Sequence, residues 1–371
     1  MLFSYFYTLL THSLFTPVPN PVLEEMTDTV THSDTHSDSV MYESRLHTHL
    51  EKILTSPPKK HTFLTHSLHT SQIDSNELNR MCQSVINVND KADFVLIKMI
   101  RLLYFESESE SLVQSQRVVD QALAKFPFWI RKEKGNGEYS AIEKIVFWSE
   151  NHTFMFLSSA HLFYQRSKRL GLECLANERE ELLLRAYLDA HVAFNGVYEI
   201  LSCTYLPYTI SSLLNLYDYS EDCIVQEKAR VLLDKIISQL LLVCNIDGVC
   251  NLAASARQYP AFRFRNFGHN VNQLISLCTG HSADPINGSP LADFLLTSSY
   301  RVTDDLIQKH WQFSGFYSQR VNHETAATKA IYENTGIDSL DCTTFYWYVF
   351  RYDMNVILDD SYIFSGTCTQ L

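Results

Sequence analysis

The stretch SEDCIVQEKARVLLDKIISQLLLVC, residues 220–244, carries the strongest structural signal in the chain. Its apolar residues recur at steps of three and four, which places them on one face of a helix. They are Val225, Ala229, Leu232, Ile236, Leu240 and Val243. Leu233, Ile237 and Leu241 widen this face beyond that of a surface helix. The segment is therefore predicted to be a helix that is buried on much of its circumference.

The ends of this helix are also marked. Ser220 is a suitable N-cap, and Glu221 and Asp222 follow it in the first turn. Acidic side chains there interact favourably with the positive end of the helix dipole. Asp247 and Gly248 come after the last apolar residues and are predicted to stop the helix.

Similar helical patterns cover much of the chain from about Asn76 onward. They are predicted over residues 91–105, 111–126, 153–169, 177–195, 205–217, 267–279 and 302–312. Glycine or proline separates them, as in KEKGNGEYS (132–140) and DPINGSP (284–290). No long stretch alternates polar and apolar residues as a half-buried strand would. The predicted fold class is therefore all-α, an array of antiparallel helix pairs.

The N-terminal part of the chain has a repetitive sequence with a biased composition. THSL occurs at residues 11–14 and again at 65–68, and THSDTHSD occupies residues 31–38. An ACTC repeat in DNA translates into Thr-His-Ser-Leu, so we interpret the region as derived from simple-sequence DNA and not as a metal-binding tract. Residues 1–76 are predicted to be a low-complexity, disordered extension, and residues 77–371 the helical domain.

The composition argues against several classes of function. The 42 acidic and 30 basic residues give a formal net charge of −12, and no basic stripe offsets it, which disfavours nucleic acid as a partner. The nine cysteines form no CxxC and no paired Cys/His spacing, so we expect neither a disulfide framework nor a zinc site. No nucleotide-binding, serine-hydrolase or metalloprotease motif occurs, and no cofactor is expected.

The sequence also predicts no contact with a membrane. Every apolar run falls short of the roughly 20 residues that a membrane helix needs. The N-terminal LFSYFYTLL is apolar, but it is short and lacks a positive flank, so it does not resemble a signal peptide. These features, with the unpaired pattern of cysteines, favour an intracellular location.

Four polar clusters stand at or near the ends of predicted helices. They comprise Glu150, Asn151 and His152 beside Trp148; Tyr198, Glu199, Ser202, Tyr205 and Tyr208; Arg257 and Tyr259; and His269, Asn270 and Asn272. Each cluster alone fits a structural role, such as helix capping or a satisfied core partner. Polar groups at helix ends with aromatic neighbours are also typical of the lining of a pocket. Spacing along the chain leaves open whether the four clusters meet.

Three segments resemble a group of large α-helical proteins. FWSENHTFMFLSSAHLF (147–163), GVYEILSCTYLPYTISSLLNLYDYS (196–220) and ARQYPAF (256–262) occur in that order in a group similar to the α/α-toroid, or six-hairpin, glycosidase and polysaccharide-lyase superfamily. The resemblance spans about residues 147–310. It implies a toroid of antiparallel helical hairpins that acts on a polysaccharide or oligosaccharide in a cleft at one end. Fewer helices are predicted than a full toroid has, which indicates an incomplete barrel.

The resemblance also implies roles for particular residues. Toroid lyases that act on uronic-acid polymers often carry an Asn-Asn-His element, which Asn151 and His152 match, with Glu150 in place of the first Asn. In a lyase, amide and guanidinium groups neutralise the uronate carboxylate, while a histidine and a tyrosine transfer protons. The implied catalytic residues are Glu150, His152, Glu199 and Tyr205, and the implied substrate-binding residues are Trp148, Asn151, Arg257, Tyr259 and His269.

Two other interpretations stay open. A hydrolase would use Glu150 and Glu199, with the carboxylates about 5–5.5 Å apart for retention or roughly 6.5–9.5 Å apart for inversion of configuration. A non-catalytic helical scaffold would bind a glycan or a protein without converting it. Glu150 argues against the lyase, because a carboxylate that faces an anionic substrate would repel it.

Overall fold

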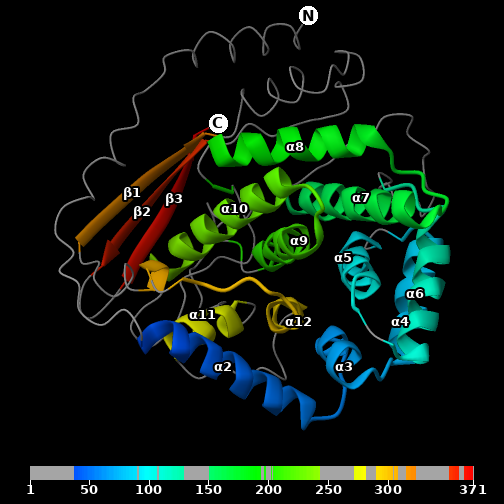
Figure 1. Ribbon diagram of the computed structural model, residues 1–371. Coiled ribbons are helices and arrows are strands. Elements are labelled where there is room, and N and C mark those ends of the chain that lie inside the picture. The colour runs from blue at the N-terminus through cyan, green and yellow to red at the C-terminus, as the bar shows by residue number, and fades with distance from the viewer. Residues whose placement is uncertain are drawn as a thin grey trace, which may run out of the picture. The chain divides into compact units, whose positions relative to one another are not determined.

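The computed structural model describes residues 37–89, 92–106, 108–128, 150–193, 196–197, 202, 204–242, 271–280, 290–303, 305–307, 315–322, 351–358 and 363–370. Figure 1 shows the elements that these residues form. The helices are α2 (Ser37–Leu54), α3 (Phe63–Thr70), α4 (Ser75–Ile86), α5 (Ala92–Leu103), α6 (Glu110–Leu123), α7 (Glu150–Leu170), α8 (Glu178–Ala193), α9 (Leu206–Tyr219), α10 (Cys223–Leu242), α11 (Asn272–Thr279) and α12 (Pro290–Leu296). The strands are β1 (Gly315–Asn322), β2 (Arg351–Leu358) and β3 (Ile363–Gln370).

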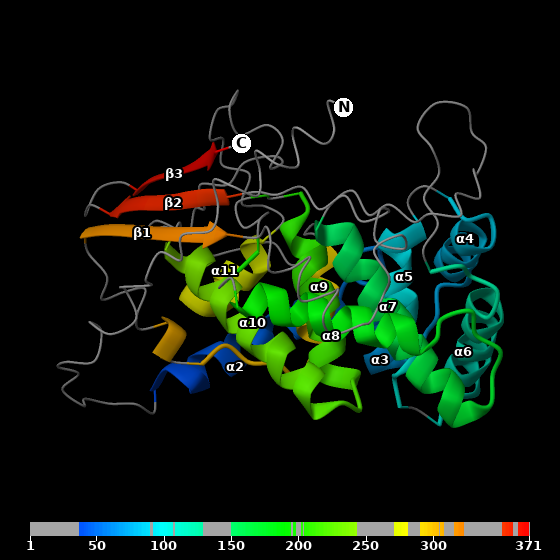
Figure 2. The same ribbon diagram turned by 90° about the horizontal axis from the view of Figure 1, so that it is seen from above.

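Helices α5, α7 and α9 are neighbours, as Figures 1 and 2 show. Close to the start of α5, the ring of Phe94 lies edge-on to His152 of α7 and to Tyr208 of α9. His152 and Tyr208 stand in the first turns of their own helices. The N-termini of all three helices therefore meet.

The opposite ends of these three helices also meet. Gln165 of α7 donates hydrogen bonds to the hydroxyl of Tyr104, directly after α5, and to the carbonyl of Tyr219, the last residue of α9. The rings of Tyr104 and Tyr219 stack with centroids 4.8 Å apart. Contacts at both ends show that α5, α7 and α9 run parallel to one another.

Other helices cover this parallel layer. His191, near the end of α8, lies 3.6 Å from Glu150 at the start of α7, so α7 and α8 form an antiparallel pair. Helix α10 packs on α8 and α9, and α4 packs on α5 and α6. The described residues between 37 and 296 are thus helices and short connections, which confirms the predicted helical character of this part of the chain.

None of the helices in the described part is long and apolar enough to cross a membrane.

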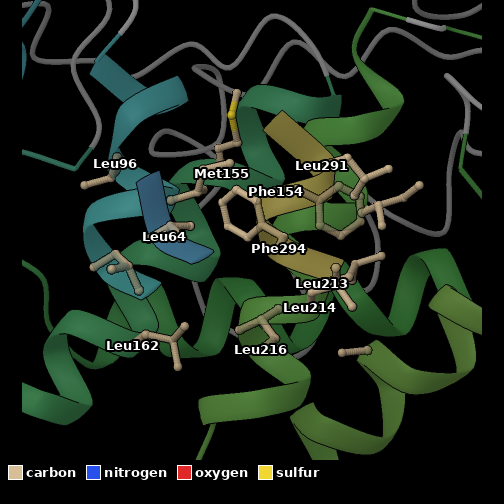
Figure 3. Packing of buried hydrophobic residues seen from close by; sticks show 14 of the residues in the cluster. Leu64, Leu96, Phe154, Met155, Leu162, Leu213, Leu214, Leu216, Leu291 and Phe294 are labelled. Carbon is tan, nitrogen blue, oxygen red and sulfur yellow. The ribbon is translucent and has the colours of Figure 1, made fainter. Parts of the chain in front are cut away.

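Five helices contribute to the centre of the hydrophobic core. Leu64 of α3, Leu96 of α5, Phe154 of α7, Leu213 of α9 and Phe294 of α12 belong to one cluster, shown in Figure 3. Each of the five is fully buried. Burying a side chain of this size stabilises a fold by about 1.5–3 kcal/mol relative to leaving it exposed. The apolar faces of short helices, which are weak signals in the sequence, therefore have large effects in the packed structure.

The buried face predicted for residues 220–244 is confirmed, but the N-cap is a different residue. The described members of that face, from Val225 to Leu240, are at most 1% exposed. The carboxylate of Asp222 accepts hydrogen bonds from the backbone N–H groups of Ile224 and Val225, which makes it the cap of α10. Ser220 instead accepts from the N–H of Asp222. Both residue types are good caps, and the sequence alone does not show where the helical backbone begins.

Packed helices begin well before the predicted domain boundary at residue 76. Helices α2 and α3 are part of the core, where Tyr42, Ile53 and Leu64 are at most 2% exposed. Thr65, in the second THSL copy, is also buried and hydrogen-bonds to Asp293 of α12. Biased composition is therefore compatible with a packed helix when its polar groups find partners. Residues 1–36 lie outside the described residues.

Predicted helix ends differ from the structure in two further places. Helix α11 begins at Asn272, within the predicted 267–279, of which residues 267–270 lie outside the described residues. The helix predicted over 302–312 is wrong at its start, because residues 302–303 are not helical and 305–307 form a single helical turn. Residues 304 and 308–312 lie outside the described residues.

The C-terminal part contains strands that the sequence did not predict. The order β1-β2-β3 is antiparallel throughout, with Gly315 opposite Leu358 and Leu358 opposite Ile363. These segments lack a strict alternation of polar and apolar residues; β2, for example, ends in three consecutive apolar residues. Their aromatic and β-branched residues are favourable for strands but indicate strands only weakly. The all-α prediction therefore does not hold for residues 315–322, 351–358 and 363–370.

Replacing Asp74 by alanine is expected to lower the free energy of unfolding by about 1 kcal/mol. The Asp74 carboxylate caps α4 by accepting from the N–H groups of Asn76, at 2.9 Å, and Glu77, at 3.2 Å. Urea denaturation of the full chain measures the loss. Asp74→Ser keeps an oxygen acceptor and is the matched control, expected to stay within a few tenths of a kcal/mol of the parent. Equal losses in both variants would contradict this role.

Candidate functional site

The first turns of α5, α7 and α9 bring together an aspartate, a histidine and a tyrosine. Asp93 is the second residue of α5, His152 the third of α7 and Tyr208 the third of α9. Pro207 lies in the first turn of α9, where its missing N–H costs no hydrogen bond. Helix N-termini carry positive partial charge, so this end of the layer favours acidic side chains and anionic ligands.

Asp93 and His152 are in hydrogen-bonding contact through Oδ2 of the carboxylate and Nδ1 of the ring. Asp93 is 2% exposed, whereas 19% of the His152 side chain is accessible. The other Asp93 oxygen is 3.1 Å from the N–H of Phe94. A carboxylate on Nδ1 fixes the orientation of the ring and, in the neutral form, places the lone pair on Nε2. This arrangement suits a general base.

The aromatic side chain of Phe94 contacts both the histidine and a tyrosine. The ring of Phe94 lies 5.5 Å from that of His152 and 4.5 Å from that of Tyr208, edge-on in both cases. Burial raises the pKa of Tyr208, and the charges of Asp93 and Tyr205 raise it further. Its hydroxyl therefore keeps its proton at neutral pH. The site thus combines a candidate proton acceptor with a candidate proton donor.

Glu150 points away from this site. Residues 150 and 152 are separated by about 200° around a helix of 3.6 residues per turn, so they face different neighbours. His152 pairs with α5, whereas Oε1 of Glu150 lies 3.6 Å from Nδ1 of His191 on α8. Burial lowers the pKa of His191 to about 4, and its Nδ1 is 3.0 Å from the carbonyl of Gly196. Glu150, whose charge would repel an anionic substrate, therefore lies on the α8 side of α7.

Two further predicted residues lie near the site. Asn151 is 1% exposed, so its amide is inside the protein. Asn151-His-Thr matches the acceptor motif for N-glycosylation, but a glycan on this buried amide is incompatible with the folded chain. Tyr205 directly precedes α9 and is half-buried, and its N–H donates to the hydroxyl of Ser202. Ser202 is fully buried and anchors the start of α9. Tyr205 is close enough to Tyr208 to affect its pKa.

The remaining predicted residues cannot be placed in the site. Those outside the described residues are Trp148, Tyr198, Glu199, Arg257, Tyr259, His269 and Asn270. The structure therefore brings together parts of the first two clusters and adds Asp93. Sequence reasoning missed Asp93 because an acidic residue in the first turn of a helix is most often a partner of the helix dipole.

A second group of polar side chains is buried between α3, α5, α9 and α12. Arg101 is fully buried and donates to Asn215, Asp218 and Thr297 at 2.6–2.9 Å. On the same helix, Nζ of Lys98 donates to the carbonyl of Lys60 and lies 3.4 Å from Oδ2 of Asp293. Two cations thus face two carboxylates within the core. Such a balanced, hydrogen-bonded group is a structural element of the helix packing.

Neither a metal cluster nor a known relative identifies the site. Within the described residues, no group of three or more histidine, cysteine, aspartate or glutamate side chains could hold a metal ion. The chain matches no protein-family model, no curated protein and no solved structure. Function must therefore be inferred from the site residues and from the resemblance in the sequence.

Proposed function

We propose that the protein is a polysaccharide lyase that cleaves a uronic-acid polymer by β-elimination at the first turns of α5, α7 and α9. His152 is the general base, Asp93 orients it, and Tyr208 is the general acid. The observation that carries the proposal is the buried carboxylate of Asp93 on Nδ1 of a partly accessible histidine. A histidine held in this way is a common device for moving protons in active sites.

The reaction uses each of these groups once. Nε2 of His152 removes the C5 proton of the uronate, and the electron pair forms a double bond between C4 and C5. The C4–O bond breaks, and the hydroxyl of Tyr208 donates its proton to the departing oxygen. The C5 proton becomes acidic only when the charge of the uronate carboxylate is stabilised, and the N-termini of three parallel helices favour that charge.

Elimination is better supported than hydrolysis. A glycosidase needs two carboxyl groups on either side of the bond that is cleaved. Glu150 is buried toward α8, Glu199 lies outside the described residues, and Asp93 is engaged by His152. Among the described residues near the start of α7 and α9, His152, Tyr205 and Tyr208 are partly accessible, and these residue types suit proton transfer without a carboxylate nucleophile.

The proposed architecture is an α/α toroid. Its support is the parallel layer of α5, α7 and α9, the antiparallel pairing of α7 with α8, and the packing of α10 on α8 and α9. Inner helices of a toroid run parallel, and each is joined to an outer helix that runs back. Under this proposal, the first turns of the parallel helices form one rim of the barrel, where a polymer would bind.

The test is an activity screen of the full chain on neutral and uronic-acid polysaccharides, following ultraviolet absorbance and reducing ends together. A lyase produces both signals, because elimination leaves a conjugated double bond. His152→Ala is expected to reduce the rate at least about a hundredfold. Asp93→Asn is expected to lower kcat and to change the pH profile, because it alters the group that orients the base. His47→Ala, at an exposed histidine of α2, is the matched control and should keep full activity.

Other outcomes would overturn the proposal. Reducing ends without absorbance would identify a hydrolase. Full activity in His152→Ala would remove the histidine from the mechanism. If the folded chain reacted with none of the substrates, the non-catalytic scaffold would be favoured. A binding assay with the same polysaccharides would then test that interpretation.

A further inference from the structure

A serine and a histidine lie together where the end of α9 meets the middle of α7. Ser220 directly follows α9, and its Oγ is 3.0 Å from Nε2 of His161 on α7. His161 is nine positions after His152, which corresponds to about 13 Å along a helix axis. The serine–histidine pair is therefore separate from the Asp93–His152 site. Both of its residues are buried, with Ser220 4% and His161 3% exposed.

The histidine is the nearer of two possible acceptors for the hydroxyl proton of Ser220. Oγ already accepts from the N–H of Asp222 at 3.2 Å. Two acceptors are available for its own proton, Nε2 of His161 at 3.0 Å and the carbonyl of Asp222 at 3.4 Å. The second distance exceeds the usual O–H···O range of about 2.5–3.0 Å. The geometry thus favours donation from Ser220 to Nε2.

The histidine is in the form that accepts a proton. Burial lowers the pKa of His161 to about 4; the charge of Asp222 opposes this shift, and the charge of Arg185 adds to it. Asp222 is in turn paired with Arg185 of α8 at 2.9 Å. At neutral pH the ring is therefore neutral. In the tautomer that carries its proton on Nδ1, Nε2 is a base next to a hydroxyl, which is the arrangement that activates a serine nucleophile.

We propose that Ser220 is an activated nucleophile, with His161 as its base, which takes an acyl or phosphonyl group from a small electrophile. The proton of Oγ passes to Nε2 while Oγ bonds to the electrophilic carbon or phosphorus. The leaving group departs with its electron pair and takes the proton from His161. Ser220 stands three residues before the first residue of α10, and the positive end of that helix favours the negative charge that develops.

The pair favours a single covalent modification over turnover. Nδ1 of His161 is buried and has no hydrogen-bond partner among the described residues. Serine hydrolases place a carboxylate there, which stabilises the imidazolium that forms. Without that support the histidine assists formation of the ester but is a poor catalyst of its hydrolysis. The small accessible area of Ser220 restricts the reaction to compact reagents.

A compact fluorophosphonate without a reporter group tests this proposal on the folded full chain, with the adduct detected by its mass. The expected result is one label, located on Ser220 by peptide mass spectrometry, and no label in Ser220→Ala. His161→Gln is expected to react at least tenfold more slowly. Ser299→Ala removes an exposed serine that hydrogen-bonds to Asp218 and is the matched control, expected to label like the parent.

Three results would overturn the proposal: no label on the folded chain, a label on another residue, or equal rates in the parent and His161→Gln. A comparison that needs no variant is the parent unfolded in urea, where the two side chains separate. It should lose the reactivity of Ser220, and an unchanged rate would show that the fold does not activate the serine. The labelling measurements do not depend on lyase activity, so they test the reactivity of Ser220 separately from the proposed function.

Discussion

Replacing Asp293 by alanine is expected to lower the free energy of unfolding by about 3–5 kcal/mol. Asp293 is fully buried in α12 and accepts hydrogen bonds from the N–H groups of Leu64 and Thr65 and from the hydroxyl of Thr65. It is also the carboxylate next to the buried ammonium of Lys98. Alanine would leave that charge without a counterion and the start of α3 without acceptors, and both changes are costly inside a protein.

Equilibrium denaturation of the full chain in urea or guanidinium measures this loss. The matched control is Glu227→Ala, which removes one carboxylate of an exposed pair with Arg230 and is expected to cost no more than about 1 kcal/mol. The double variant Lys98→Met with Asp293→Asn removes both charges while keeping an acceptor for α3. It is expected to be more stable than Asp293→Ala. If Asp293→Ala cost no more than the control, the buried pair would not stabilise the fold.

The contact between Thr65 and Asp293 also shows why the sequence predicted only part of the structure. Thr65 and Asp293 are 228 residues apart, and neither stands in a pattern that points to the other. Periodicity predicts which face of a helix is buried, as it did for α10, but not which helix packs against that face. Helices α3 and α12, of 8 and 7 residues, are also shorter than the window in which a helical period is measurable.

The candidate site was predictable to a similar extent. The polar residues after Trp148 and around Tyr205 indicated chemistry at helix ends, and the structure places His152 and Tyr208 against the ring of Phe94. The partner of His152 could not be predicted, because Asp93 lies in a different helix, 59 residues earlier. The different directions of Glu150 and His152 follow from helical geometry once the start of α7 is known.

Acidification from pH 7 to pH 4 is expected to cost about 3 kcal/mol of stability for each of two buried histidines, His161 and His191. Burial lowers the pKa of both to about 4 in the folded chain, whereas an unfolded histidine titrates near 6.5. Below pH 6.5 the unfolded chain therefore binds protons that the folded chain does not. The stabilisation is complete above pH 6.5 and is lost as the pH falls toward 4.

The measurement is the free energy of unfolding against pH for the parent and for the double variant His161→Gln with His191→Gln. Glutamine does not titrate in this range and keeps an amide donor for the carbonyl that His191 contacts. The double variant is expected to lose roughly 6 kcal/mol less than the parent between pH 7 and pH 4. His47→Gln, at an exposed surface histidine, is the control and should follow the parent. Because all three chains share the remaining titrating groups, a double variant that also followed the parent would mean that neither buried ring resists protonation in the fold.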